Sequence, residues 1–328
     1  MTTNHAFKFA IMGAGNIAHK FYDAVSRLEG CSVAAVASKS MERAKAFAGK
    51  YRIPGAYDSY EQMLIEEKPD CVYIATTCAS HYDLSMLCLK YNTPILCEKA
   101  FVLNSTQARE VFVLAKEKQV FVMEAMWSRF LPAVTKAKEW LQAGRIGTPV
   151  YANIKIGFHA PEDPGNRYFS PKLGGGAAFD LTVYGYEIMT WLMGEPSEVK
   201  ATAVFGPTGV DVTDHVLLRF PGKDGAADML ASCESSFLTN IGEGLTICGS
   251  AGRMTVPHPH WGAEVFVYDE QGNQVDYFKD EVTENGFVYE ISEVMNCIRD
   301  GKTESDIVPH SLTIACAEVF DQLMAGKK

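Results

Sequence analysis

Three side chains that can exchange protons with a substrate lie in two short stretches of this sequence: Lys99, Asp180 and Tyr184. Lys99 belongs to CEKAF, and the other two belong to LGGGAAFDLTVYGY, which begins at Leu173. Residues four apart on a helix share one face, so Asp180 and Tyr184 are expected to project together. A phenol ordinarily has a pKa of about 10, and a nearby ammonium group lowers it. The alternative is a surface lysine, an aspartate in a helical ion pair and a core tyrosine.

A glycine pattern near the start of the chain is suited to binding phosphate groups. Residues 13–18 read GAGNIA, directly after the apolar run FKFAIM. In the dinucleotide fingerprint the first glycine forms a tight turn, and the second lets the backbone approach a pyrophosphate. Gly13, Gly15, Asn16 and Ile17 are therefore the candidates for pyrophosphate binding, where the helix N-terminus attracts negative charge. The alternative is an ordinary glycine-rich turn between a strand and a helix.

The first third of the chain predicts the scaffold that positions these residues. Strand patterns are expected at 7–12, 32–37, 70–76, 94–97 and 120–124, and helical patterns at 41–50, 60–67, 80–90 and 105–118. This alternation predicts an α/β Rossmann domain, a doubly wound parallel sheet whose ligands lie at the carboxyl ends of its strands. Glu98 and Lys99 end one of these strands, so they are expected beside the nicotinamide of a bound dinucleotide.

The pattern changes after residue 124. Helices are expected at 133–143, 174–193, 287–299 and 307–324, and strands at 149–158, 199–205, 214–221, 226–237, 243–249, 252–257, 263–269 and 273–278. Successive strands without intervening helices predict an α+β domain with a large, mainly antiparallel sheet. We therefore expect an NAD(P)-binding domain at 1–124 and a substrate-binding and oligomerisation domain at 125–328, with room for the C-terminal helix to pack back on the first.

Composition excludes several classes of partner. The 328 residues carry a net charge of −10, which argues against nucleic acids and anionic membranes. No apolar run is long enough to predict a membrane-spanning helix. The nine cysteines include no C-x-x-C pair, which is typical of reduced thiols in a cytoplasmic protein. No metal site is predicted.

The residues after the second expected strand favour NADP over NAD. That strand ends at Ala37 and is followed by Ser38, Lys39 and, one turn into the next helix, Arg43. NAD-binding proteins usually place an acidic residue here to bind the ribose 2′-hydroxyl. Hydroxyl and cationic groups suit a 2′-phosphate instead. NAD stays possible, because Lys39 and Arg43 also suit a solvated helix start.

Several longer motifs resemble one known family. They are GAGNIAHKF, VASKSMERAKAFA, CEKAF, MEAMWSRFLP, GRIGTP, RYFSPKLGGGAAFDLTVYG and IVPHSLTIACAEVFDQL, which together span nearly the whole chain. The chain resembles the glucose–fructose oxidoreductase/inositol dehydrogenase (Gfo/Idh/MocA) family. Within this family it is most similar to the branch of dimeric dihydrodiol dehydrogenases and NADP-dependent D-xylose dehydrogenases. The resemblance implies hydride transfer between NADP and a sugar, polyol or vicinal diol. It also implies a homodimer or homotetramer formed through the C-terminal sheet.

The same resemblance assigns roles to individual residues. Lys99 matches a lysine that contacts nicotinamide ribose and substrate. Asp180 matches the carboxylate of the helix motif, and Tyr184 matches the general acid/base. The matches on the cofactor side are Ser38, Lys39, Thr76, Thr77, His81, Trp127 and Arg129. The expected substrate side comprises Trp127, Phe158, Arg167, Asp180 and Tyr184.

Two positions depart from the family pattern. Ala100 replaces the proline after the motif lysine. A cis peptide before a residue other than proline costs about 2.5–4 kcal/mol, so both the cis and the trans form stay open here. Cys78 stands where the family's nucleotide loop usually has a polar residue such as asparagine.

Three rival functions remain. One is a regulatory protein of the same fold that binds NADP without catalysis, against which the presence of Lys99, Asp180 and Tyr184 argues. Another is an inositol-type or 1,5-anhydrofructose-type reductase. The third is a metal hydrolase using His258-Pro259-His260, although no acidic cluster adjoins that sequence to complete a metal site.

Overall fold

The computed structural model describes residues 6–161, 163, 165–222 and 225–327. The chain forms two compact units. Unit 1 comprises Met1–Ala125 and Asn285–Ile314, and unit 2 comprises Met126–Glu284 and Ala315–Lys328. From the sequence we expect a boundary between two domains at residues 124 and 125, and this boundary stays a prediction.

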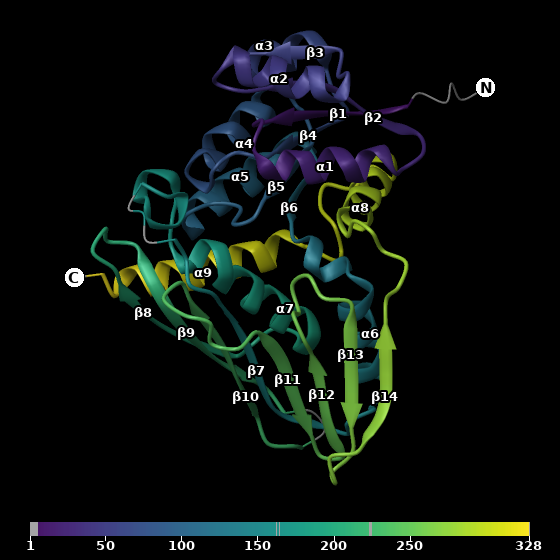
Figure 1. Ribbon diagram of the computed structural model, residues 1–328, viewed down its shortest axis with the longest axis vertical. Coiled ribbons are helices and arrows are strands. Elements are labelled where there is room, and N and C mark those ends of the chain that lie inside the picture. The colour runs from purple at the N-terminus through teal and green to yellow at the C-terminus, as the bar shows by residue number, and fades with distance from the viewer. Residues whose placement is uncertain (1–5, 162, 164, 223–224, 328) are drawn as a thin grey trace. The chain divides into compact units, whose positions relative to one another are not determined.

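Unit 1 is built on a six-stranded sheet in the order β3-β2-β1-β4-β5-β6 (Figure 1). Its strands are β1 (Phe7–Met12), β2 (Cys31–Ala37), β3 (Gly55–Tyr57), β4 (Cys71–Ile74), β5 (Ile95–Glu98) and β6 (Val122–Ala125). All neighbours pair in parallel, which confirms the predicted doubly wound sheet. The strand order reverses between β1 and β4, and in such sheets ligands bind beside this switch point at the carboxyl ends of the strands.

The helices of unit 1 begin and end where local sequence signals indicate. They are α1 (Asn16–Ser26), α2 (Met41–Tyr51), α3 (Tyr60–Glu67), α4 (His81–Lys90), α5 (Ser105–Lys118), α8 (Phe287–Arg299) and the first residues of α9 (His310–Ala325). Ser40, Ser59 and Asn104 cap α2, α3 and α5 by accepting a backbone N–H of the first turn, as polar N-cap residues do. The apolar face of α1 packs onto the sheet, where the rings of Phe21 and Tyr73 stack 3.8 Å apart.

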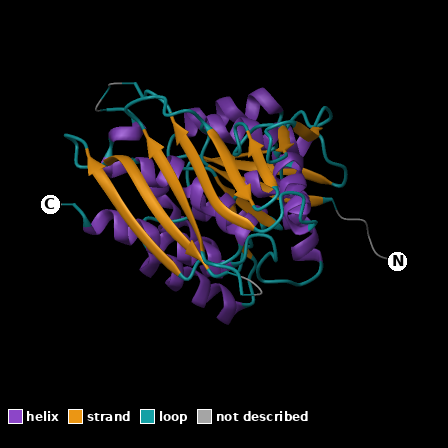
Figure 2. Ribbon diagram, turned by 90° about the horizontal axis from the view of Figure 1, so that it is seen from below, coloured by secondary structure: helices purple, strands orange, loops and turns teal. Residues whose placement is uncertain are grey.

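Unit 2 is built on an eight-stranded sheet in the order β14-β13-β12-β11-β7-β10-β9-β8. Its strands are β7 (Pro149–Gly157), β8 (Glu198–Phe205), β9 (Asp211–Phe220), β10 (Met229–Ser236), β11 (Gly244–Gly249), β12 (Gly252–Val256), β13 (Glu264–Tyr268) and β14 (Gln274–Lys279). Only β7 and β10 pair in parallel, so the predicted large, mainly antiparallel sheet is confirmed. The helices α6 (Pro132–Gln142) and α7 (Val183–Met193) pack on one face of it. Within the described residues no helix of unit 2 covers the face nearest the viewer in Figure 2.

The segment before α7 is not the continuous α-helix that we expect over residues 174–193. Gly174 and Gly176 have φ angles of 73° and 137°, which a helix does not accommodate. A Cβ on Gly176 would lie 2.2 Å from a carboxylate oxygen of Asp211, and the Ala178 N–H donates to the other oxygen at 2.6 Å. A π-helical turn then covers Ala178–Thr182 and leads into α7. The close approach to Asp211 therefore delays the helix by several residues.

Candidate active site

The turn after β1 fits the phosphates of a dinucleotide. Gly13 has a φ of 108°, and a Cβ there would lie 2.7 Å from the carbonyl oxygen of Ala75. Gly15 is the N-cap of α1, and no side chain caps the N–H groups that follow in Asn16 and Ile17. The first turn of α1 holds no acidic side chain. These uncapped N–H groups and the positive end of the helix suit a pyrophosphate.

The residues after β2 surround the same turn with hydroxyl and cationic groups. Ser38 is buried, and its N–H donates to the Tyr57 carbonyl at 3.0 Å, whereas Lys39 is exposed. The Arg43 guanidinium donates to the carbonyl oxygen of Ala14 at 3.3 Å. Arg43 therefore reaches from α2 to the glycine turn, where a phosphate on the ribose of a bound cofactor would meet its charge.

The loop after β4 provides a second indication of a cofactor-binding site. The hydroxyl of Thr76 is buried and, among the described residues, has no hydrogen-bond partner. A buried hydroxyl is costly when it is not hydrogen-bonded, so this group suits a ligand at the sheet edge. Thr77, the next residue, is partly buried and begins the short helical turn Cys78–Ser80 as its N-cap.

His81 joins this loop to the loop that carries Lys99. Its imidazole is 1% exposed, with Nε2 3.1 Å from the Thr76 carbonyl oxygen and Nδ1 2.9 Å from that of Ala100. Burial lowers the pKa of His81, and these carbonyl groups oppose that shift. The structure therefore places His81 where it holds the backbone of both cofactor-side loops.

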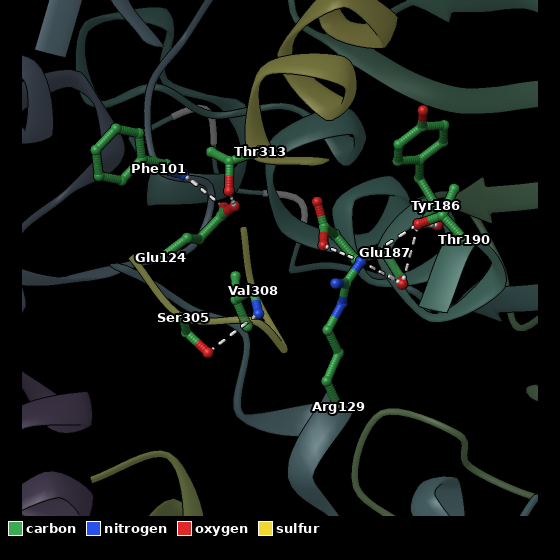
Figure 3. Close-up of polar contacts among 9 residues, drawn as sticks. All are labelled: Phe101, Glu124, Arg129, Tyr186, Glu187, Thr190, Ser305, Val308 and Thr313. Carbon is green, nitrogen blue, oxygen red and sulfur yellow. Dashed lines mark hydrogen bonds and ion pairs between the residues drawn. The ribbon is translucent and has the colours of Figure 1, made fainter. Parts of the chain in front are cut away.

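The loop after β5 is fixed through its backbone. The peptide between Lys99 and Ala100 is cis, and Lys99 is partly buried. The Phe101 N–H donates to Glu124 at 2.9 Å, and the other oxygen of the same carboxylate accepts the Thr313 hydroxyl at 2.8 Å (Figure 3). The Cys78 thiol lies 3.2 Å from the Ala100 carbonyl oxygen. Side chains from several elements thus converge on the residues next to Lys99.

Glu124 is a residue that our sequence reasoning missed. It lies in β6 and is 2% exposed. Acidic side chains are almost never fully buried without partners. A single acidic residue inside the apolar strand VFVMEAM was the signal that could have identified it.

Glu98 ends β5 inside a buried polar cluster. It is 6% exposed and accepts the hydroxyl of Tyr73. Glu290 on α8 is also buried, and burial, with the charge of Glu98 as a second cause, raises its pKa well above the usual range. Neither oxygen of Glu290 has a hydrogen-bond partner among the described residues. The cofactor-binding role of Glu98 stays a prediction.

In unit 2, Tyr184 lies between two other rings. It is the second residue of α7 and is 8% exposed. The indole N–H of Trp127 donates to its hydroxyl oxygen at 3.0 Å. The His260 ring lies 4.7 Å from the Tyr184 ring, measured between centroids. Trp127 and Tyr184, which we predict to be site residues, are therefore direct neighbours, and His260 joins them.

Asp180 and Arg167 are two further predicted site residues that the structure brings together. Their side chains are 3.2 Å apart and hydrogen-bonded. The guanidinium also lies over the Tyr168 ring at 4.2 Å from its centroid. Phe158 follows β7 and packs edge-on against Tyr168 and Phe237. These residues place an ion pair beside a group of aromatic rings near the π-helical turn.

Arg129 forms a buried ion pair that supports α7. It is 1% exposed and lies 2.6 Å from the carboxylate of Glu187. It also donates to the Glu187 carbonyl at 2.8 Å and to the Thr190 hydroxyl at 3.3 Å (Figure 3). Burial raises the pKa of Glu187, and the Arg129 charge opposes that shift. The pair ties the short helical turn that carries Trp127 to the helix that carries Tyr184. The cofactor-binding role expected for Arg129 stays a prediction.

Lys99 belongs to unit 1, whereas Asp180 and Tyr184 belong to unit 2. An acid–base set of all three residues therefore stays a prediction. In the part of the chain that the structure describes, no three His, Cys, Asp or Glu side chains are arranged to hold a metal ion. His258 and His260 instead both face Glu243, at 3.0 and 2.8 Å. None of the described helices is both long and apolar enough to cross a membrane.

Comparisons with known proteins agree with this architecture. Residues 7–126 match the model of the oxidoreductase family with an NAD-binding Rossmann fold, and residues 134–255 match the GFO/IDH/MocA C-terminal domain. A trans-1,2-dihydrobenzene-1,2-diol dehydrogenase of Mus musculus is 32% identical over 325 residues, covering 97% of this chain and 96% of the mouse protein.

Two solved structures share the fold over 98% of this chain and 97% of their own, each with a TM-score of 0.86 and 20% identity. One is a 3-ketoreductase from Actinomadura kijaniata in complex with NADP and TDP-benzene, and the other an aldose–aldose oxidoreductase from Caulobacter crescentus. With both family models matched in order and a relative above 30% identity over nearly its whole length, this chain belongs to the Gfo/Idh/MocA family of oxidoreductases.

Proposed function

We propose that this protein is an NADP-dependent dehydrogenase or reductase acting on the CH–OH group of a sugar, polyol or vicinal diol. One observation carries the proposal: the Tyr184 hydroxyl is held by Trp127, in a chain whose full-length relatives include a dihydrodiol dehydrogenase. The sugar alternative is supported by the activity for which the aldose–aldose oxidoreductase, a protein of the same fold, is named.

The proposed mechanism assigns proton transfer to the protein. NADP, when bound, supplies a nicotinamide ring that accepts or donates hydride. Tyr184 takes the proton of the reacting hydroxyl during oxidation and returns it during reduction. Lys99 favours the phenolate form by its charge. Asp180, paired with Arg167, orients a substrate hydroxyl, and Trp127 and Phe158 provide apolar surface for the substrate.

The cofactor would be held by residues whose chemistry and local geometry suit it. Gly13, Gly15 and the first N–H groups of α1 would bind the pyrophosphate, as their geometry allows. Ser38, Lys39 and Arg43 would bind the 2′-phosphate. Thr76, Thr77, His81 and Glu98 would border the nicotinamide side. The buried Thr76 hydroxyl without a partner supports this placement.

The first experiment follows the absorbance of the reduced nicotinamide with NADP and NAD. The panel contains aldoses, inositols, trans-dihydrodiols and, in the reducing direction, 1,5-anhydrofructose. Turnover with one class identifies the reaction, and faster turnover with NAD contradicts the 2′-phosphate assignment. Tyr184→Phe is expected to lower kcat by about 10²- to 10⁴-fold. Full turnover in that variant would show the acid/base assignment to be wrong. Tight NADP binding without any turnover would favour the regulatory alternative.

The cofactor preference has its own test in Arg43. Arg43→Ala removes a cation that reaches the glycine turn. We expect the KM for NADP to rise about tenfold, since a charge-assisted hydrogen bond contributes about 1.5–3 kcal/mol. The KM for NAD, which lacks the 2′-phosphate, is expected to stay nearly constant. An equal rise in the KM for NADP and for NAD would show that Arg43 does not bind the 2′-phosphate.

We further propose a cytoplasmic protein that forms a homodimer, or a homotetramer, through the unit 2 sheet. None of the nine cysteines, all of which lie in the described residues, forms a disulfide, which suits a reducing compartment. The uncovered face of the sheet exposes five large apolar side chains: Tyr151, Val204, Leu217, Leu230 and Tyr277. Exposed apolar patches mark interaction sites. Light scattering is expected to show an oligomer for the wild type and a monomer for the double variant Leu217→Glu/Leu230→Glu. A monomeric wild type would contradict the proposed assembly.

A further inference from the structure

The loop between β12 and β13 carries His258-Pro259-His260-Trp261, to which the proposed mechanism assigns no role. The loop has a fixed shape. His258 adopts a φ of 52°, and its carbonyl accepts the N–H groups of Trp261 and Gly262 at 3.1 and 2.6 Å. A Cβ on Gly262 would lie 2.5 Å from the Pro257 carbonyl oxygen. The backbone therefore sets the positions of both imidazole rings.

Glu243, directly before β11, orients the two imidazoles. One oxygen accepts from His258 Nδ1 at 3.0 Å, and the other lies 2.8 Å from His260 Nδ1. The two oxygens thus each face one ring. Burial acts to raise the pKa of Glu243, but contacts with His260 and His258 outweigh it and lower that pKa. Glu243 is therefore a carboxylate at neutral pH that hydrogen-bonds Nδ1 of His258 and lies beside Nδ1 of His260.

His260 brings this carboxylate–imidazole pair to the proposed acid/base residue. Its ring lies against that of Tyr184, at 4.7 Å between centroids, and its side chain is 18% exposed. The ring turns Nδ1 toward Glu243, which leaves Nε2 on the side of the imidazole away from that nitrogen. His258 is more exposed, at 46%, and its ring stacks on Trp261 instead. Only one of the two imidazoles therefore contacts Tyr184.

We propose that His260, oriented by Glu243, binds a substrate hydroxyl that lies outside the vicinal pair containing the reacting one. With a proton on Nδ1 facing the carboxylate, Nε2 accepts a hydrogen bond. A site built to bind a hydroxyl discriminates against analogues that lack it. The preferred substrates are therefore ring polyols of the aldopyranose type, with hydroxyls beyond the reacting pair, over arene diols. This inference rests on the proposed role of Tyr184.

The test measures binding without turnover, in the presence of NADPH, which cannot accept hydride from an alcohol. Isothermal titration calorimetry compares D-xylose with trans-1,2-cyclohexanediol, a ring with only two vicinal hydroxyls. The main variant is His260→Phe, which keeps a ring beside Tyr184 but has no nitrogen. His260→Ala is the second variant, and the exposed His215 in β9 supplies the control His215→Ala.

We expect His260→Phe and His260→Ala to weaken D-xylose binding about tenfold, the effect of losing one hydrogen bond. Cyclohexanediol binding should change less than twofold, and His215→Ala should change neither ligand. An unchanged affinity for D-xylose, equal losses for both ligands, or a wild type that binds neither probe would overturn the inference. Full turnover of Tyr184→Phe would instead refute the proposed function, without altering these binding constants.

Discussion

Lys99 and Tyr184, to which we assign roles in the same proton transfer, are held in place in different ways. The Lys99 loop is fixed through its backbone: Glu124 accepts the Phe101 N–H, and His81 binds the Ala100 carbonyl. Tyr184 is fixed at its side chain, where Trp127 donates to its hydroxyl. The helix below it is held by the buried Arg129–Glu187 ion pair.

The difference shows which substitutions should disturb each region. In the Lys99 loop, neighbouring side chains determine where the backbone goes, so changes remote from the chemistry move the lysine. Around Tyr184, the helix position depends on two buried opposite charges, and the removal of one leaves the other uncompensated. The position of the Lys99 loop should therefore change when a single hydrogen bond is lost. The region around Tyr184 should be destabilised when one charge of the buried ion pair is removed.

The largest expected effect tests the charge pair below Tyr184. Arg129→Met removes the cation from the buried carboxylate of Glu187. We expect the free energy of unfolding to fall by about 3–5 kcal/mol, the usual cost of a broken buried ion pair. Urea denaturation followed by circular dichroism measures it.

The matched control is Arg27→Met, which breaks the partly exposed pair with Asp23. Exposed pairs contribute at most about 1 kcal/mol. Similar losses in Arg129→Met and Arg27→Met would show that α7 does not depend on buried charge.

The next prediction concerns the backbone of the Lys99 loop. Glu124→Ala leaves the N–H of Phe101 without the acceptor seen at 2.9 Å. An unsatisfied buried donor costs about 1–3 kcal/mol, and the displaced Lys99 should lower kcat. Thr313→Val removes only the second hydrogen bond of Glu124 and is expected to cost about 1 kcal/mol. If both variants keep wild-type kcat, Glu124 does not position the lysine.

A third prediction concerns pH and the acid cluster at the end of β5. Burial raises the pKa of Glu290, so the folded state keeps a proton that the unfolded state loses above about pH 4.3. This group therefore stabilises the fold less and less as the pH rises above that value toward its folded pKa. Glu290→Gln, which cannot titrate, should gain on the wild type by up to about 1.4 kcal/mol per pH unit. The measurement is the free energy of unfolding of the wild type and of Glu290→Gln from pH 5 to about pH 7. A constant difference between the two proteins over this range would contradict the prediction.

The smallest expected effect comes from the Cys78 thiol. Its sulfur lies 3.2 Å from the Ala100 carbonyl oxygen, and burial raises its pKa, so it is a thiol and a weak donor. Cys78→Ala should cost below about 1 kcal/mol and leave the KM for NADP unchanged. A loss as large as that of Glu124→Ala would mean that the thiol is a main anchor of the loop.

Local patterns in the sequence predicted much of this fold. Helices 60–67, 105–118 and 287–299 have the predicted bounds. Ser59 and Asn104 cap the first two, and nearby residues set the apolar face of all three. The glycine turn and its parallel sheet were predictable for the same reason. Gly13 occupies a backbone conformation and a space that other residues do not fit. Arg167 and Asp180, two predicted site residues, form an ion pair, and their roles stay predictions.

Other features depend on residues far apart in the chain. Asp211 decides where the helix before Tyr184 begins, although it lies more than thirty positions after Gly176. Residues 285–314 form part of unit 1, and Thr313 reaches Glu124 there. His260 looked like a metal-ligand candidate, but the fold places it between Glu243 and Tyr184. The sequence alone determined most of the elements and the glycine turn, because these depend on local backbone chemistry, and its motifs indicated the family. Only the tertiary structure decided which buried polar groups meet, because each must find its partner across the fold.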